Sequence, residues 1–305
     1  MKAGQASYAR LPMRRPPVAY AALAFAALLF GATFVVIKEA VVILPPLAFV
    51  GWRFLIGAVA LLVLGLPRGK TIWRDGLAAG VLLFAGYALQ TAGLAQTSAS
   101  NSGLITGLYV VFTPLLAAAV ARHGVSIPTI IGTIVAFVGL ALLTVGEGLH
   151  LAAGDLLTVG CAVAFAGHIV VLSRVALRHP VVPFTAIQLL ITASLALIGS
   201  AITEGFPVPS VEVVPALLMT GLVVSGGAFL LQVWSQTVIG PSRTAIILAL
   251  EPAFATAFAA WLLAERLDPQ GWIGAALILV GIYLVLAGAG DRDAVPAAEA
   301  VTPAH

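Results

Sequence analysis

Residues 131–148 read IGTIVAFVGLALLTVGEG, and residues 273–290 read IGAALILVGIYLVLAGAG. The two stretches share an Ile-Gly pair at their start, a Val-Gly pair seven residues later, and two glycines at matching positions near their ends. Each stretch is apolar and has the length of a helix that crosses the hydrocarbon core of a bilayer, which takes roughly 20 residues. The sequence therefore indicates an internal duplication whose repeating unit contains a membrane span.

The rest of the chain is equally apolar. Of its 305 residues, 61% are hydrophobic and 9% are charged, whereas a soluble domain carries about 25% charged residues. One protein core cannot bury this much apolar surface, so lipid must cover the remainder. We therefore predict an all-α integral membrane protein with ten transmembrane helices, at residues 18–37, 46–66, 75–94, 101–121, 128–145, 154–172, 183–203, 212–235, 242–263 and 270–288.

The duplication extends beyond these two spans. Upstream of them, Gln96-Thr97 matches Gln236-Thr237, so the ten helices are five helices repeated. Because five is odd, the second copy enters the membrane from the opposite side, and secondary transporters characteristically use such inverted repeats to alternate access to a midplane site. The predicted domains are a cytoplasmic segment (1–17), two five-helix repeats (18–148 and 149–290) and a disordered cytoplasmic tail (291–305).

The basic residues predict the orientation. With the N-terminus inside, twelve lysines and arginines fall in cytoplasmic segments, and only Lys38 and Arg266 fall in outer loops. Cytoplasmic loops of membrane proteins carry this excess. We therefore expect both termini in the cytoplasm and a bacterial-type inner membrane as the location.

Polar residues at helical spacing inside apolar spans suggest a path for a solute. Such stripes occur in five spans, although a single stripe is more often a helix-packing feature. The spans with glycine pairs, Gly132/Gly139 and Gly274/Gly281, have none. Because small residues let helices approach closely, these two spans pack either within a monomer or across a homodimer. The candidate substrate-binding residues are Thr33, Tyr87, Gln90, Tyr109, Phe165, His168, Phe229, Gln232 and Glu251.

Two charged residues lie within predicted spans. Glu251 directly precedes Pro252, which leaves the carbonyl of Leu248 without its usual donor and can bend the helix. A carboxyl group at this depth is a functional candidate that can bind a cation or a proton; alternatively, a protonated Glu251 bonds to a neighbouring helix. We interpret Arg53 as an anchor that snorkels to the outer surface or pairs with Glu39.

Several of these residues also match a family pattern. In the second repeat, Leu250-Glu251-Pro252 is followed by Ala264-Glu265-Arg266-Leu267 and Gly271-Trp272-Ile273-Gly274; in the first, Gly31-Ala32-Thr33-Phe34 is followed by Lys38 and Arg53-Phe54-Leu55. Over nearly the whole chain, the sequence resembles the EamA branch of the drug/metabolite transporter superfamily. The resemblance implies ten helices, cytoplasmic termini and export of small metabolites, commonly amino acids. The first repeat has Phe112-Thr113-Pro114 where the second has Leu250-Glu251-Pro252.

The leading hypothesis is thus a secondary transporter that exports small organic metabolites, with a small-molecule substrate and the lipid bilayer as its partners. An uptake permease or facilitator for sugars, nucleosides or quaternary amines is the alternative. An intramembrane enzyme or a channel is a remote alternative, because His-Glu-x-x-His and GxSxG motifs, filter loops and charged rings are absent. The lack of a GxxxxGK[ST] loop argues against direct use of ATP. We expect no catalytic residue, metal site, cofactor or nucleic-acid partner.

Overall fold

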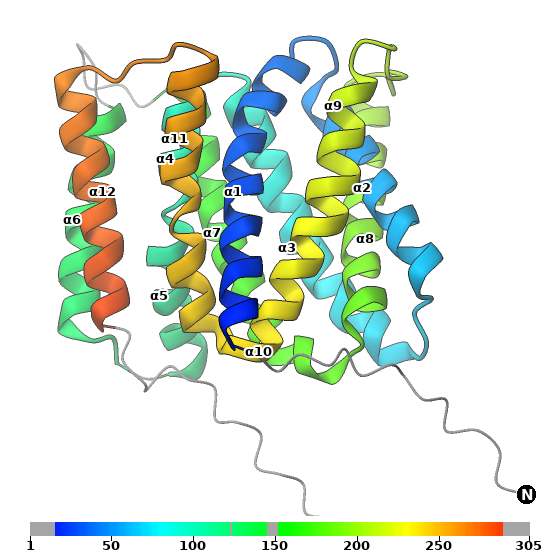
Figure 1. Ribbon diagram of the computed structural model, residues 1–305, viewed down its shortest axis with the longest axis horizontal. Coiled ribbons are helices and arrows are strands. Elements are labelled where there is room, and N and C mark those ends of the chain that lie inside the picture. The colour runs from blue at the N-terminus through cyan, green and yellow to red at the C-terminus, as the bar shows by residue number, and fades with distance from the viewer. Residues whose placement is uncertain (1–15, 123, 145–151, 289–305) are drawn as a thin grey trace, which may run out of the picture.

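The computed structural model describes residues 16–122, 124–144 and 152–288, and every regular element within them is helical (Figure 1). The predicted tail, most of the predicted N-terminal segment, and repeat positions Gly146, Gly148 and Gly290 lie outside these residues. The elements are α1 (Pro16–Ala40), α2 (Pro46–Leu64), α3 (Lys70–Leu94), α4 (Ala99–Thr106), α5 (Tyr109–Ala121), α6 (Ile127–Thr144), α7 (Ala153–Val175), the short η1 (Ala176–Arg178), α8 (Val181–Thr203), α9 (Val214–Leu218), the π-helical η2 (Met219–Ala228), α10 (Phe229–Leu248), α11 (Glu251–Leu262) and α12 (Pro269–Gly288).

The helices run side by side and form one bundle (Figure 1). Among the described residues, seven helical segments are long and apolar enough to cross a membrane. The prediction of an α-helical, multi-pass membrane protein is therefore confirmed. The start of α1 and the end of α12 lie at the same end of the bundle (Figure 1).

Two predicted spans are interrupted near their middle. The span predicted at 101–121 divides into α4 and α5 at Gly107 and Leu108, and the span predicted at 242–263 divides at Ala249 and Leu250, between α10 and α11. Pro252 accounts for the second break, because a proline denies the carbonyl four residues earlier its helical donor. Helix α10 also continues through the gap that the sequence predicted at residues 236–241.

The two interrupted spans cross each other close to their breaks. Helix α4 packs on α11, and a side chain at Gly107 would collide with the ring of Pro252. Only glycine allows this approach at the crossing. The packing brings the first residue of α5, Tyr109, and the first residue of α11, Glu251, together in the interior of the bundle.

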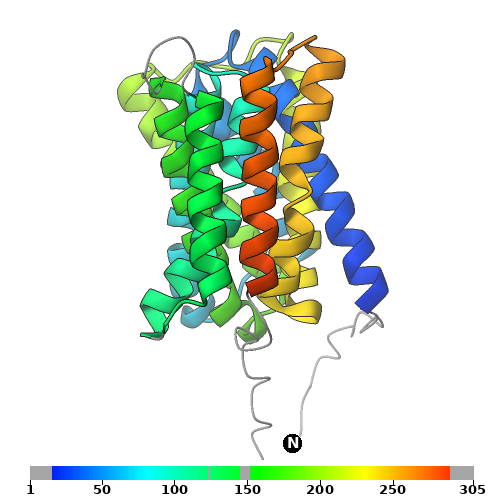
Figure 2. The ribbon, with the colours of Figure 1, turned by 90° about the vertical axis from the view of Figure 1, so that its left-hand side faces the viewer.

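Helices α6 and α12 form a pair at one edge of the bundle, where they lie next to each other (Figures 1 and 2). A Cβ atom on Gly281 would lie 2.6 Å from the carbonyl oxygen of Gly132. The glycine pairs singled out in the sequence therefore pack against each other within one chain. A homodimer through these helices stays a prediction, and it would use their outer faces, where Ile134 and Tyr283 are exposed.

Acidic side chains cap helices across long sequence distances at the end of the bundle opposite the N-terminus of α1. Both carboxylate oxygens of Glu265 accept backbone hydrogen bonds at the start of α4, from Ala99 and Ser100, each at 2.9 Å. Glu204 similarly accepts bonds from Leu47 and Ala48 at the start of α2. A carboxylate at a helix N-terminus satisfies free N–H groups and complements the helix dipole.

The Glu265 cap predicts a loss of stability when it is removed. We expect Glu265→Ala to lower the free energy of unfolding by about 1–2 kcal/mol, the usual cost of deleting a capping side chain. Thermal unfolding of the purified protein measures the effect. The matched control is Glu212→Ala, because the Glu212 side chain is exposed. Equal effects of the two substitutions would show that the cap contributes nothing.

Candidate functional site

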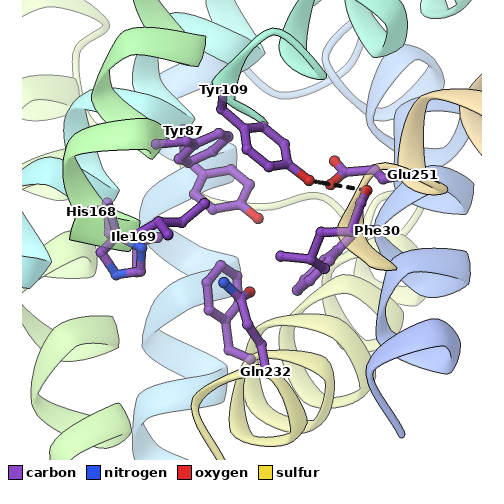
Figure 3. Close-up of a pocket in the computed structure, with 11 residues that line it drawn as sticks. Phe30, Tyr87, Tyr109, His168, Ile169, Gln232 and Glu251 are labelled. Atoms are coloured by element: carbon purple, nitrogen blue, oxygen red, sulfur yellow. Dashed lines mark hydrogen bonds between the residues drawn. The ribbon is translucent and has the colours of Figure 1, made fainter. Parts of the chain in front are cut away.

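A cavity lies among α1, α3, α5, α7, α10 and α11, beside the two helix breaks. It contains about 360 Å³ of space between atoms, part of it open to solvent. Figure 3 shows the labelled side chains converging on this space from separate helices. The lining residues are Phe30, Leu83, Tyr87, Tyr109, Phe165, His168, Ile169, Phe229, Gln232, Leu248 and Glu251.

Seven of the nine candidate residues from the sequence line this cavity, from Tyr87 on α3 to Glu251 on α11. The other two do not. Thr33 is buried and donates a hydrogen bond to the carbonyl of Phe30 on its own helix. Gln90 donates to the hydroxyl of Thr106 at 3.3 Å and thereby joins α3 to α4. Thr33 thus bonds within its own helix and Gln90 joins two helices, and a role of the other seven in binding stays a prediction.

Glu251 is tied to the opposite helix break by Tyr109. The Tyr109 hydroxyl lies 3.2 Å from Glu251 Oε2 and 3.0 Å from the carbonyl oxygen of Leu248 (Figure 3). This carbonyl is the one that Pro252 deprives of its helical donor. The side chain of one interrupted span thus supplies the hydrogen bond that the other interrupted span lacks.

The geometry links Glu251 to a proton. A phenol has a single hydrogen to donate, yet Tyr109 has two acceptors within reach. If Glu251 is ionised, the two acceptors share that hydrogen. If Glu251 is protonated, it donates to the Tyr109 oxygen while Tyr109 donates to Leu248, and both contacts are satisfied. Protonation therefore changes the strength of the connection between the two helix breaks.

His168 lines the cavity and is held in place by a hydrogen bond to α8. Its Nε2 lies 2.8 Å from Oε1 of Gln188 on α8, and the amide nitrogen of Gln188 donates to the carbonyl of Phe184. Because that donation orients the amide, Oε1 is the acceptor and His168 Nε2 carries hydrogen. Nδ1 of a neutral His168 is then an acceptor.

Aromatic rings form most of the remaining wall. Phe229 lies 5.1 Å from Phe30 and 5.8 Å from Tyr87 between ring centroids, and Tyr87 lies 5.0 Å from Phe165. Such edge-on contacts hold rings in place. Together with Gln232, Glu251 and His168, they give an apolar cavity with a few polar groups, which is the usual composition of a small-molecule site.

Arg53 does not snorkel, so the interpretation as an outer-surface anchor was wrong. Its side chain is 0% exposed, and its guanidinium lies between the rings of Phe54 and Tyr87, with Cζ 4.8 and 4.5 Å from their centroids. Glu39 is exposed and does not bond to the guanidinium. The signal available in the sequence was the position of Arg53, seven residues inside an apolar span, which favours the interior as much as the surface.

Removal of the Tyr109 hydroxyl should also lower the stability of the protein. We expect Tyr109→Phe to lower the free energy of unfolding by about 1–3 kcal/mol, because it leaves buried Leu248 and Glu251 acceptors without a donor. Thermal unfolding measures this, with Tyr283→Phe as the control because Tyr283 is 70% exposed. A Tyr109→Phe protein as stable as the parent would mean that the two contacts do not stabilise the fold.

Comparison with known proteins identifies the family. The model of the EamA-like transporter family matches this chain twice, at residues 18–145 and 152–287. The chain belongs to the EamA-like transporter family. The resemblance to the EamA branch of the drug/metabolite transporters is thus confirmed, and this EamA-like protein is a membrane transporter and not an enzyme.

Individual relatives agree with this assignment. An uncharacterized transporter of Archaeoglobus fulgidus is 34% identical to this EamA-like protein over 264 residues, which is 86% of this chain and 84% of that protein. A WAT1-related protein of Arabidopsis thaliana is 26% identical over 202 residues, 57% of this chain and 51% of that one. A crystal structure with 21% identity superposes with a TM-score of 0.64 over 88% of this chain and 96% of that one, which shows a shared fold.

Proposed function

We propose that this transporter exports small organic metabolites, in particular amino acids or related compounds, by alternating access across a bacterial-type inner membrane. The observation that carries the proposal is the cavity at the junction of the two interrupted spans, with Glu251 and Tyr109 in its wall. Interrupted helices at the midplane are where secondary transporters bind their solutes.

The proposal includes ten spans arranged as inverted repeats, with both termini in the cytoplasm. In addition to the seven long spans there are two shorter apolar helices within α6 and α12, and we count the interrupted span that contains α11 as the tenth. The start of α1 and the end of α12 at one end of the bundle fit an even number of crossings (Figure 1). The excess of lysine and arginine on that side supports a cytoplasmic location.

The cavity wall favours an amphiphilic solute. The rings of Tyr87, Phe165 and Phe229 offer apolar contact, and Glu251 offers an acceptor for an ammonium group or a proton. An amino acid with an apolar side chain has an apolar part that fits the rings and an ammonium group that Glu251 can accept. Coupling to protons through Glu251 would provide the energy for export, since the bond between the helix breaks depends on its protonation.

Counterflow tests the proposal. The purified protein in liposomes, preloaded with one unlabelled amino acid, is expected to take up the labelled form above equilibrium and to saturate, with aromatic and cationic amino acids included in the panel. Saturable counterflow of any member would establish a carrier for that class. Folded protein without counterflow for any amino acid would refute this substrate class, and sugars, nucleosides and quaternary amines would be tested next.

A further inference from the structure

Arg53 is the largest fully buried side chain in the described part of the chain. All three nitrogens of its guanidinium are inaccessible to solvent, and none has a hydrogen-bond partner among the described residues. The Tyr87 hydroxyl contributes an electrostatic and a side-chain hydrogen-bond interaction to the guanidinium, but it is a neutral group, and no Arg53 nitrogen meets it in full hydrogen-bond geometry. A group with five N–H donors is therefore left unsatisfied inside the bundle.

The surroundings of Arg53 hold its charge without neutralising it. The rings of Tyr87, Phe54 and Phe49 lie around the guanidinium, at 4.5, 4.8 and 6.0 Å from Cζ. Aromatic faces attract a cation but accept no conventional hydrogen bond from its edge. The buried acidic groups of the described chain are engaged elsewhere: Glu251 with Tyr109, Asp75 with His179, and Asp155 with Thr97.

Tyr87 connects this charge to the solute cavity. It lines the cavity, and its ring lies directly against the guanidinium. Two further buried hydroxyl groups without partners are close by in the fold. Thr91 is one helical turn along α3 from Tyr87, and Ser225 lies beside Gly57, one turn along α2 from Arg53. Buried polar groups without partners thus lie one helical turn from Tyr87 and near Arg53.

We propose that Arg53 is an anion subsite that binds the carboxylate of the transported solute. The inference rests on the proposed function and names its substrate class: a compound with one carboxylate. A guanidinium and a carboxylate form a planar pair with two parallel hydrogen bonds. The Tyr87 ring contacts the guanidinium and also lines the cavity, and rotation of that side chain would admit the carboxylate.

A buried Arg53 without a bound carboxylate should lower the stability of the solute-free protein. A buried ion without a counter-ion destabilises a fold, and its replacement by an apolar side chain of similar size relieves the strain. A structural arginine would show the opposite behaviour. Arg53→Met is therefore expected to raise the melting temperature of the solute-free protein, by about 3 °C, whereas the matched substitution Arg68→Met, at an exposed arginine, should leave it unchanged.

Ligand-induced shifts in melting temperature test binding directly. The purified full chain, Arg53→Met, Arg53→Lys and Arg68→Met are heated with pairs of compounds that differ at the carboxylate: L-phenylalanine and its amide, benzoate and benzamide, gluconate and glucose. Sodium chloride is tested alone. We expect at least one carboxylate to raise the melting temperature of the parent and of Arg68→Met more than its partner compound does. Arg53→Met should lose that difference, and Arg53→Lys should keep part of it.

Each outcome decides the proposal. A response to L-phenylalanine supports both the subsite and amino acids as solutes. A response to benzoate or gluconate alone supports the subsite and removes amino acids from the proposed function. The proposal is overturned if carboxylates and partner compounds act equally, if no carboxylate stabilises the parent, if chloride acts as strongly as any carboxylate, or if Arg53→Met lowers the melting temperature or fails to fold.

Discussion

Glu251→Gln is expected to abolish proton-driven accumulation of solute while leaving exchange of solute for solute intact. A pH gradient of one unit supplies about 1.4 kcal/mol per proton, which corresponds to at most a roughly tenfold concentration ratio. Glutamine keeps the size of the side chain and a hydrogen bond to Tyr109, but it carries no exchangeable charge. The concentration ratio of the solute across liposomes with an imposed pH gradient should therefore fall from near tenfold to about one. Counterflow without a gradient should persist, because the carbonyl oxygen of glutamine still accepts a hydrogen bond from an ammonium group.

The groups around Glu251 make it the principal candidate for this role. Tyr109 on α5 bonds to it, Tyr87 on α3 and Cys161 on α7 interact with it electrostatically, and His168 lines the same cavity. Because His168 also carries an ionisable ring, His168→Gln must be measured in parallel. Glu39→Gln is the control, since Glu39 is exposed near the end of α1. An unaltered gradient response in Glu251→Gln would contradict the coupling hypothesis.

Gly281→Ala is expected to destabilise the protein strongly through the α6–α12 pair. The added methyl group would lie 2.6 Å from both the backbone nitrogen of Ala136 and the carbonyl oxygen of Gly132. Backbone atoms cannot turn away as side chains can, so the two helices must separate and lose packing along their length. We expect a loss of at least about 2–3 kcal/mol in the free energy of unfolding, as for an overpacked core.

Gly226→Ala is the matched control for this substitution. It makes the same chemical change in a helical segment, but its methyl group would meet no atom closer than 3.5 Å. We expect it to leave stability unchanged or to raise it by up to about 1 kcal/mol, because alanine favours helix over glycine. If Gly281→Ala instead kept its melting temperature and only dissociated a dimer, the glycines would serve association between chains.

Much of this architecture could be predicted from the residues alone. A long run of residues without charges must lie in lipid or in a protein core. The apolar stretches therefore predicted the positions of the helices without any knowledge of which helices pack against them. Proline acts on its own backbone, and the free carbonyl of Leu248 followed directly from Pro252. Stripes of polar residues named seven side chains of one cavity, since a helix repeats every 3.6 residues and places them on one face.

Other features depend on contacts between distant segments. Gln90 fits one of these stripes, yet the packing of α3 against α4 turns its side chain to Thr106. The break at Gly107 is decided where α4 meets Pro252 of α11, and the donor for Leu248 comes from Tyr109, 139 residues away. A sequence pattern shows which residues share one face of a helix, but it does not show which other helix packs against that face.

Arg53 shows this division most sharply. The sequence by itself determined that a cation lies within an apolar helix, because the local order of residues sets the depth of a side chain in the membrane. Only the tertiary structure decided whether that cation reaches the surface, pairs with a carboxylate or remains unpaired. The reason is that the rings of Phe54 and Tyr87, which enclose it, come from two different helices. The free energy of a buried charge depends on such neighbours.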